Sequence, residues 1–445
     1  MEPARHAYRV VLVAITAIAV QAIPHNVEVR AAAGPRDRQP AAAAVAPSSQ
    51  ARASSDFADS VGVCMHLGRV RTHYVQRFAE IEKLLIASGI RHVRTDPVTA
   101  PEAVANVRKL AAQGVQFDFI IHPDGERLTA AQLLENVRRN FADCTVFIEG
   151  LNEPDSRPEQ ARQWMRQIQQ ICKADDVLKG IPILGSALAH PHDAAARIGD
   201  CSTLVDAGNI HAYPGGRAPE VTLPLYIGYV QPQYPHVKYA ITETGYHSAL
   251  NNPANKHKPA SREAEAIYMP RLYLEHFRAG ILRSYKYQFA DDRTDDEATK
   301  RHQPVQEANF GYVDYQLQAK PAYHAVKNLL AILHDEKTKA FQPQSLAYSL
   351  EGAKDQLRSL LLQKADGDFY LAVWRAVSVW DENSRRDMPV QSVPVGIRLP
   401  GTAKAVRVYR PTHSAEPVKT DTNAARLVLD LGADAVIIQI EQFVP

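Results

Sequence analysis

The sequence predicts an α/β fold, with a (β/α)8 TIM barrel over residues 57–336 followed by a small antiparallel β-sandwich over residues 337–445. In the first region, eight short runs rich in β-branched residues alternate with longer segments of helical period. The runs start roughly 26 to 45 residues apart, which is the size of a strand–helix unit with parallel strands. In the second region, strands follow one another through turns such as ADGD and LGAD, without helical segments between them.

The eight barrel strands are expected in runs that are mostly apolar in their middle and polar where they end. They cover residues 60–66, 89–96, 115–122, 145–153, 181–188, 208–213, 237–245 and 282–289. The helices between them include residues 73–89, in which Phe78, Ile81 and Leu85 recur at helical spacing before Gly89 stops the pattern. An open doubly wound sheet is the competing fold, but the first strand is not followed by a glycine-rich phosphate fingerprint.

The chain begins with segments that we exclude from the fold. Residues 1–22 have a basic lead and an apolar core from Val10 to Val20, which is typical of a signal peptide. An uncleaved membrane anchor is the alternative, but the apolar run is shorter than the roughly 20 residues that span a bilayer. Residues 23–56 are rich in Ala and Pro and predict a linker. We therefore expect export to the periplasm or the extracellular space.

Composition excludes several classes of function. A net charge of +2 provides no overall field for nucleic acid or for an anionic membrane. The four cysteines show no metal-ligand spacing, so no metal site and no cofactor are predicted. Cys64 is expected to be a small buried residue, whereas an exported chain could form one disulfide between two of Cys144, Cys172 and Cys201. The oligomeric state is left open.

Polar side chains gather at the predicted strand ends, where TIM barrels carry their active sites. These candidates are His66, Arg94, His122, Asn152, Glu153, His211, Tyr213, Glu243 and Tyr287. Glu153 and Glu243 both end apolar strands, where a charged group is costly unless the site uses it. Glycoside hydrolysis requires two such carboxylates: one protonates the leaving oxygen, and the other attacks the sugar or activates water.

The motifs GLNEPD, which ends the fourth strand, and AITETGYH, which ends the seventh, resemble those of the clan A retaining glycoside hydrolases, in particular family 39-like enzymes with a C-terminal β-domain. The resemblance implies that Glu153 is the acid and base and that Glu243 is the nucleophile. It also implies that Arg94 keeps Glu243 ionised and that Tyr213 orients it. Asn152 would bind a sugar hydroxyl.

By the same resemblance, His66 and His211 would line the sugar pocket, and we add His122 and Tyr287 as candidate substrate-binding residues. The clan commonly has a tryptophan at the end of strand eight, where this chain offers only Tyr287 or Phe289. The substrate sugar, its linkage and the choice between internal and terminal cleavage are therefore left open. Residues 290–311 either wall an extended groove or form a surface loop.

The predicted function is a retaining glycoside hydrolase that acts on a poly- or oligosaccharide, with the two carboxyl groups about 5 to 5.5 Å apart. The first alternative is a non-catalytic polysaccharide-binding protein on a glycosidase-like barrel. The second is unrelated barrel chemistry, such as that of a lyase or an aldolase. A Schiff-base aldolase would need a strand-end lysine, and Lys286 fits that role poorly.

Overall fold

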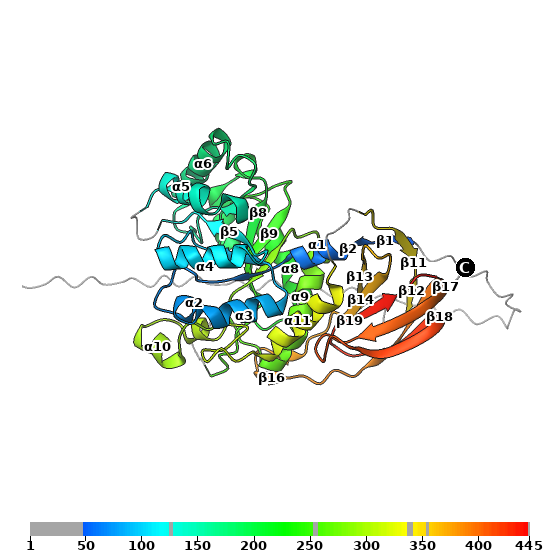
Figure 1. Cartoon of the computed structure of the whole chain (residues 1–445). Coiled ribbons are helices and arrows are strands. Elements are labelled where there is room, and N and C mark those ends of the chain that lie inside the picture. Colours follow the sequence, from blue (N-terminus) through cyan, green and yellow to red (C-terminus); the bar gives the residue numbers. More distant parts are fainter. Residues whose placement is uncertain (1–47, 124–127, 252–256, 336–340, 353–355, 444–445) are drawn as a thin grey trace, which may run out of the picture. The chain divides into compact units, whose positions relative to one another are not determined.

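The computed structural model describes residues 48–123, 128–251, 257–335, 341–352 and 356–443 (Figure 1). The predicted signal peptide and residues 23–47 of the predicted linker lie outside these ranges. Among the described residues, the helices are all too short or too polar to span a bilayer.

Eight parallel strands form a barrel, which confirms the predicted fold class. The strands are β3 (Val61–Cys64), β4 (His92–Thr95), β5 (Gln116–Ile120), β6 (Thr145–Glu149), β7 (Ile183–Leu184), β8 (Gly208–Ala212), β9 (Tyr239–Thr244) and β10 (Ser284–Lys286). Each lies within the run predicted for it. The sheet order is β7-β6-β5-β4-β3-β10-β9-β8, and a parallel bridge between Leu184 and Ala207 closes the ring.

Helices follow the strands, and their ends agree with local sequence signals. The helices are α1 (Ser54–Asp59), α2 (His73–Gln76), α3 (Phe78–Ser88), α4 (Pro101–Ala111), α5 (Ala130–Asn140), α6 (Pro158–Ala174), α7 (Pro191–Ile198), α8 (Pro219–Val230), α9 (Arg262–Arg278), α10 (Asp295–Lys300) and α11 (Pro321–Leu333), with 3-10 turns η1 (Ala142–Cys144), η2 (Ser202–Leu204) and η3 (Val305–Ala308). Five of them, α4, α6, α7, α8 and α11, begin with a proline, whose missing N–H costs nothing in a first turn. The helix predicted for residues 73–89 is divided at Arg77 into α2 and α3, and α3 ends at Gly89 with a φ of 82°.

Helix α9 differs from the other helices because it is buried along most of its surface. Thirteen of its 17 residues are buried, so it lacks the polar face of an ordinary barrel helix. Arg271 of α9 donates to Val377 O (2.9 Å) in the C-terminal domain and pairs with Glu220 of α8 (2.7 Å). Trp374 and Trp380 of the C-terminal domain are buried in one apolar cluster with α9 residues such as Leu272. The barrel and the β-domain therefore share a core at α9.

The C-terminal region is an antiparallel β-domain, as predicted. Its strands are β11 (Ser345–Ala347), β12 (Ser349–Glu351), β13 (Leu357–Gln363), β14 (Phe369–Arg375), β15 (Trp380–Asp381), β16 (Arg386–Asp387), β17 (Val393–Tyr409), β18 (Pro417–Leu431) and β19 (Val436–Ile440). Strand β17 pairs with β12 through residues 396–398 and with β19 through residues 406–409, with a register irregularity between these two stretches. A long strand that changes partners at an irregularity forms the corner of a sandwich.

The linker prediction for residues 23–56 is wrong for its last part. Strand β1 (Ser48–Gln50) pairs with β11, and strand β2 (Arg52–Ala53) pairs with β13. Helix α1 then begins at Ser54, within the predicted linker. The composition of this stretch suggested disorder because it contains few large apolar residues. Strand pairing through backbone hydrogen bonds does not need such residues, so composition could not detect these short strands.

The expected disulfide is also wrong, because all four cysteines are free thiols. Cys144 and Cys172 belong to the main apolar core, whereas Cys201 lies in a separate cluster around α7. Burial raises the pKa of Cys144 to about 11 and that of Cys172 to about 12, so both stay protonated and unreactive. These cysteines serve as small buried side chains, the role that the sequence predicted for Cys64 alone.

Candidate active site

All nine predicted site residues line one cavity of about 420 Å³ at the C-terminal ends of the barrel strands. Each strand, or the loop that follows it, contributes at least one lining residue. The predicted residues are His66, Arg94, His122, Asn152, Glu153, His211, Tyr213, Glu243 and Tyr287. Asp96, His190, Tyr226, His257, Gln306 and Glu307 are among the lining residues that the predicted set did not include.

Glu153 reaches the cavity from a strained turn rather than from the strand itself. Strand β6 ends at Glu149, four residues before the predicted end. At the next position, a Cβ on Gly150 would collide with Met165 and Ser186, so only glycine fits there. Glu153 has a φ of 49°, which is unusual for a residue with a side chain and more so before a proline. Backbone strain of this kind concentrates at functional sites.

Glu243 lies within β9, and both of its carboxylate oxygens are held by donors. Arg94 Nη1 donates to Oε1 (2.6 Å), and the Tyr213 hydroxyl donates to Oε2 (2.6 Å). Burial alone would raise the pKa of Glu243, but the charges of His211 and Arg94 and the two hydrogen bonds outweigh it and lower that pKa to about 2. Glu243 is therefore ionised at any ordinary pH.

Arg94 is itself fixed by a second carboxylate that the predicted set did not include. Glu149 is fully buried and accepts from Arg94 Nε (2.7 Å) and Nη2 (2.8 Å). Two parallel contacts hold the guanidinium plane, which directs Nη1 toward Glu243. Beside this pair, burial and the charge of Glu149 raise the pKa of Asp118 well above its usual range. Ionised Asp118 is therefore disfavoured beside ionised Glu149.

Asn152 is oriented by two contacts. Its Oδ1 accepts from Arg94 Nη2 (2.8 Å), and its backbone N–H donates to His122 Nδ1 (3.2 Å). With the oxygen occupied by the guanidinium, the amide Nδ2 is the group left to donate a hydrogen bond within the cavity. His122 thus accepts a hydrogen bond from the backbone of the loop that carries Glu153.

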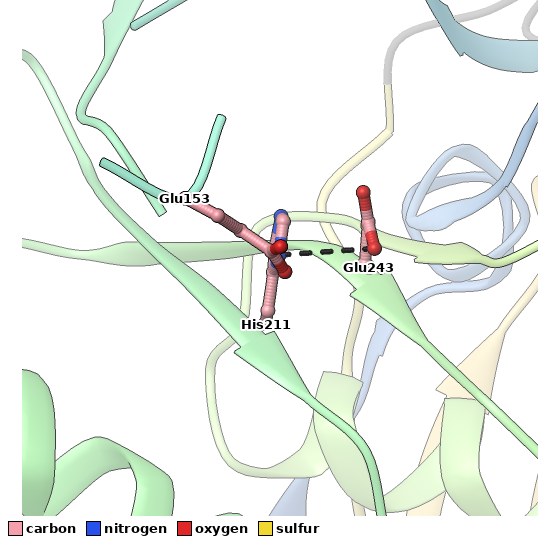
Figure 2. Close-up of side chains that lie close together, drawn as sticks. All are labelled: Glu153, His211 and Glu243. Atoms are coloured by element: carbon pink, nitrogen blue, oxygen red, sulfur yellow. Dashed lines mark hydrogen bonds and ion pairs between the residues drawn. The ribbon is translucent and has the colours of Figure 1, made fainter. Parts of the chain in front are cut away.

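His211 lies between the two glutamates (Figure 2). Its Nδ1 is 2.9 Å from Glu153 Oε1 and 3.7 Å from Glu243 Oε2. One carboxylate oxygen of Glu153 and one of Glu243 lie within 4.8 Å of each other. Burial lowers the pKa of His211, but the charge of Glu243 and the hydrogen bond to Glu153 raise it overall. The two carboxylates therefore make the buried His211 ring easier to protonate than it would be without them.

The same three side chains are close enough together to be considered as ligands for a metal ion. Their hydrogen bonds argue against that use. Both oxygens of Glu243 already accept short hydrogen bonds from Arg94 and Tyr213, and a guanidinium beside the carboxylate would repel a cation. The arrangement suits proton transfer and nucleophilic attack better than metal binding.

The wall near β10 consists of His66, Tyr287 and residues of the segment 290–311. The ring centroids of His66 and Tyr287 are 5.6 Å apart, and the Tyr287 hydroxyl donates to Glu307 Oε2 (3.1 Å). Burial lowers the pKa of His66 to about 3, so its ring is neutral. Gln306, Glu307 and Phe310 line the cavity, so segment 290–311 walls the site. Of the two aromatic residues predicted at the end of strand eight, Tyr287 lines the cavity and Phe289 is buried in the core.

Lys286 does not line the cavity. Its ammonium group is buried against Glu265 (3.1 Å) and donates to the carbonyl oxygens of Tyr246 (3.2 Å) and Tyr287 (3.0 Å) and to that of Phe310. A lysine with these partners is a structural cation that holds the chain around β10 in place. It is not available for a Schiff base.

No protein-family model matches the sequence, and no curated protein is detectably similar to it. Solved structures do resemble it. The GH39 enzyme from Xanthomonas axonopodis pv. citri aligns with a TM-score of 0.56 at 13% identity, covering 89% of this chain and 96% of that chain. A glucosidase from Croceicoccus marinus aligns with a TM-score of 0.54 at 13% identity, covering 82% and 92%.

The GH51 arabinofuranosidase from Xanthomonas axonopodis pv. citri aligns with a TM-score of 0.53 at 13% identity, covering 89% of this chain and 98% of that chain. These likenesses extend over most of each chain. At this identity they show the fold, so the chain has the architecture that the resemblance to clan A enzymes implied. Its chemistry must be argued from its own site.

Proposed function

We propose that the protein is a retaining glycoside hydrolase that cleaves O-glycosidic bonds of a poly- or oligosaccharide by double displacement. The observation that carries the proposal is the pairing of Glu153 and Glu243 across one cavity, with oxygens within 4.8 Å. Retaining enzymes have carboxyl groups about 5 to 5.5 Å apart, and inverting enzymes about 6.5 to 9.5 Å. The separation leaves no room for a water molecule between the sugar and Glu243.

In the first step, Glu243 attacks the anomeric carbon and forms a glycosyl ester as the glycosidic bond breaks. Its low pKa keeps it ionised for this attack. Glu153 transfers its proton to the departing oxygen, which leaves as an alcohol. The side-chain amide of Asn152 can donate to a sugar hydroxyl, a contact that strengthens as charge develops on the ring.

In the second step, Glu153 accepts a proton from water, and the hydroxyl attacks the anomeric carbon. The ester bond breaks and Glu243 leaves as a carboxylate. Arg94 and Tyr213 stabilise the charge that returns to its oxygens. His211 at 2.9 Å stabilises Glu153 while it is ionised between the two steps. The configuration of the sugar is inverted twice and so retained.

A non-catalytic polysaccharide-binding protein remains the second candidate, because it would use the same cavity. The contacts of Glu243 favour catalysis over binding alone. A binding site gains little from a carboxylate whose pKa is lowered to about 2 by the charges of His211 and Arg94, whereas a nucleophile must be ionised. The partners of Lys286 speak against an aldolase.

The test combines a panel of dinitrophenyl glycosides with a panel of plant and bacterial polysaccharides. Glu243→Ala should abolish turnover of every substrate that the wild type cleaves. Glu153→Ala should spare the first step on dinitrophenyl glycosides, whose leaving group departs without a proton, and added azide should restore the second step. Glu80→Ala, an exposed carboxylate paired with Arg77, is the matched control and should behave as wild type. Full activity of Glu243→Ala would exclude the proposal.

A further inference from the structure

Four rings form a cluster that runs from the cavity to the protein surface. His190 and Tyr226 line the cavity, whereas Tyr229 is 40% exposed and the His192 side chain is 52% exposed. Ring centroids are 6.2 Å apart for His190 and His192, 5.8 Å for His192 and Tyr229, and 6.1 Å for Tyr229 and Tyr226. We call these four residues the ring cluster.

The ring cluster is attached to the catalytic residues at both ends. Asp155, two residues after Glu153, accepts from the backbone N–H groups of Ala189 (3.0 Å) and His190 (2.7 Å). At the other end, the Tyr226 hydroxyl donates to the backbone oxygen of Tyr213 (3.4 Å). The rings therefore occupy a fixed position relative to Glu153 and to Tyr213, which holds Glu243.

The position of the cluster indicates which part of a substrate would meet it. An acid must face the oxygen that it protonates, so the leaving group lies on the Glu153 side of the reacting sugar. The loop of His190 is bonded to the loop of Glu153, so the rings lie on that side. Arg94, Tyr287 and Glu307 also line the cavity, but they are not bonded to the His190 loop.

Exposed aromatic rings beside a polar cavity suit a carbohydrate. The apolar C–H face of a sugar packs on an aromatic face, while its hydroxyls stay in water or bond to polar neighbours. His192 and Tyr229 extend beyond the cavity lining, so a chain longer than the leaving sugar would be needed to cover them.

We propose that the ring cluster binds sugar units on the leaving-group side of the scissile bond, so that the preferred substrate continues past the cleavage point as an oligo- or polysaccharide. This inference rests on the proposed function and adds that cleavage is internal to the chain. The cavity holds the reacting sugar, and the rings hold the part of the chain that is released as an alcohol.

A competing use of the same surface is contact with a protein. Helix α8 also exposes Val221 and Leu225, at 55% and 46%. A protein contact would use these aliphatic side chains as much as the rings and would not depend on substrate length. The ring contacts with residues of the cavity lining favour the carbohydrate.

The experiment compares wild type with Tyr229→Ala and His192→Ala on a dinitrophenyl glycoside and on oligosaccharides of increasing length. Each variant should raise KM for the longer oligosaccharides about three- to tenfold, the range of one aromatic packing contact. Neither should change KM for the aryl glycoside, which has no sugar to place on the rings. Tyr229→Phe keeps the ring and should match wild type.

The matched control is Tyr315→Ala. Tyr315 also packs on a histidine, with its ring centroid 4.3 Å from that of His73, but it does not line the cavity. Equal effects on short and long substrates, or no effect on either, would overturn the proposal. So would a change in oligomeric state of Tyr229→Ala without a change in KM.

Retardation in native gels that contain the polysaccharide provides a readout without catalysis. If the wild type hydrolyses nothing, the proposed function fails, but the cluster is still tested by this assay. Loss of retardation in Tyr229→Ala, with retardation kept in Tyr315→Ala, supports the proposal. Equal mobility of all three proteins overturns it.

Discussion

Replacing Glu149 with Gln tests whether this buried carboxylate positions Arg94. Glu149 is fully buried and makes two contacts of 2.7 and 2.8 Å with the guanidinium. Removing one partner of a buried ion pair costs about 3 to 5 kcal/mol. A glutamine keeps one acceptor oxygen, and Arg94 keeps its contacts with Glu243 and Asn152. The expected loss in the free energy of unfolding is therefore near the low end, about 3 kcal/mol.

The assay is urea denaturation at pH 7, with the hydrolysis rate of a cleaved aryl glycoside measured in parallel. The rate should fall because the guanidinium plane is no longer held by two parallel bonds. Glu351→Gln is the control: its ion pair with Arg426 is exposed, so the unfolding midpoint should hardly change. A Glu149→Gln protein as stable and as active as wild type would refute the positioning role.

Three further outcomes follow from the structure. Tyr213→Phe removes a hydrogen bond that lowers the pKa of Glu243. The pKa of Glu243 should therefore rise, and the acid limb of the pH profile of kcat/KM should move to higher pH. An acid limb that stays in place or moves to lower pH contradicts this. Burial lowers the pKa of His276 from 6.5 to about 3, so between these pH values the unfolded chain binds a proton that the folded chain does not. The free energy of unfolding therefore falls as the pH drops from 6.5 toward 3, by at most about 5 kcal/mol. His276→Gln should therefore show a weaker loss of stability in acid, measured by denaturation at pH 7 and pH 4, and an unchanged dependence would argue against it. Thiol titration of the chain, unfolded without reductant, should detect four free thiols. Detection of only two would indicate a disulfide.

The barrel could be predicted from the sequence because its signals are local. Each parallel strand is a short apolar run followed by a helix of amphipathic period, and all eight runs contain a strand. Strands β1 and β2 could not be predicted in this way. Their partners, β11 and β13, lie some 300 residues later in the chain, and pairing over such a distance leaves no mark in the composition of either segment.

The catalytic candidates were found because a charged group at the end of an apolar strand is conspicuous. Glu149 has the same chemistry, but it lies inside the predicted strand 145–153, four residues before Glu153. The site was predicted from residues at strand ends, so a carboxylate inside the strand was not included. A buried carboxylate within a strand signals an ion pair, and Arg94 was the available partner. The ring cluster had no such signal, because His190 and His192 lie at the start of α7 whereas Tyr226 and Tyr229 lie in α8, and only the fold brings these two helices together.

The anomeric configuration of the first product tests the central claim most directly. An aryl glycoside that the enzyme cleaves is hydrolysed in an NMR tube, and the anomer released before mutarotation is identified. Glu153 and Glu243 with oxygens within 4.8 Å predict that the product keeps the configuration of the substrate. A product of inverted configuration would mean that water attacks directly, and it would contradict the roles assigned to both glutamates.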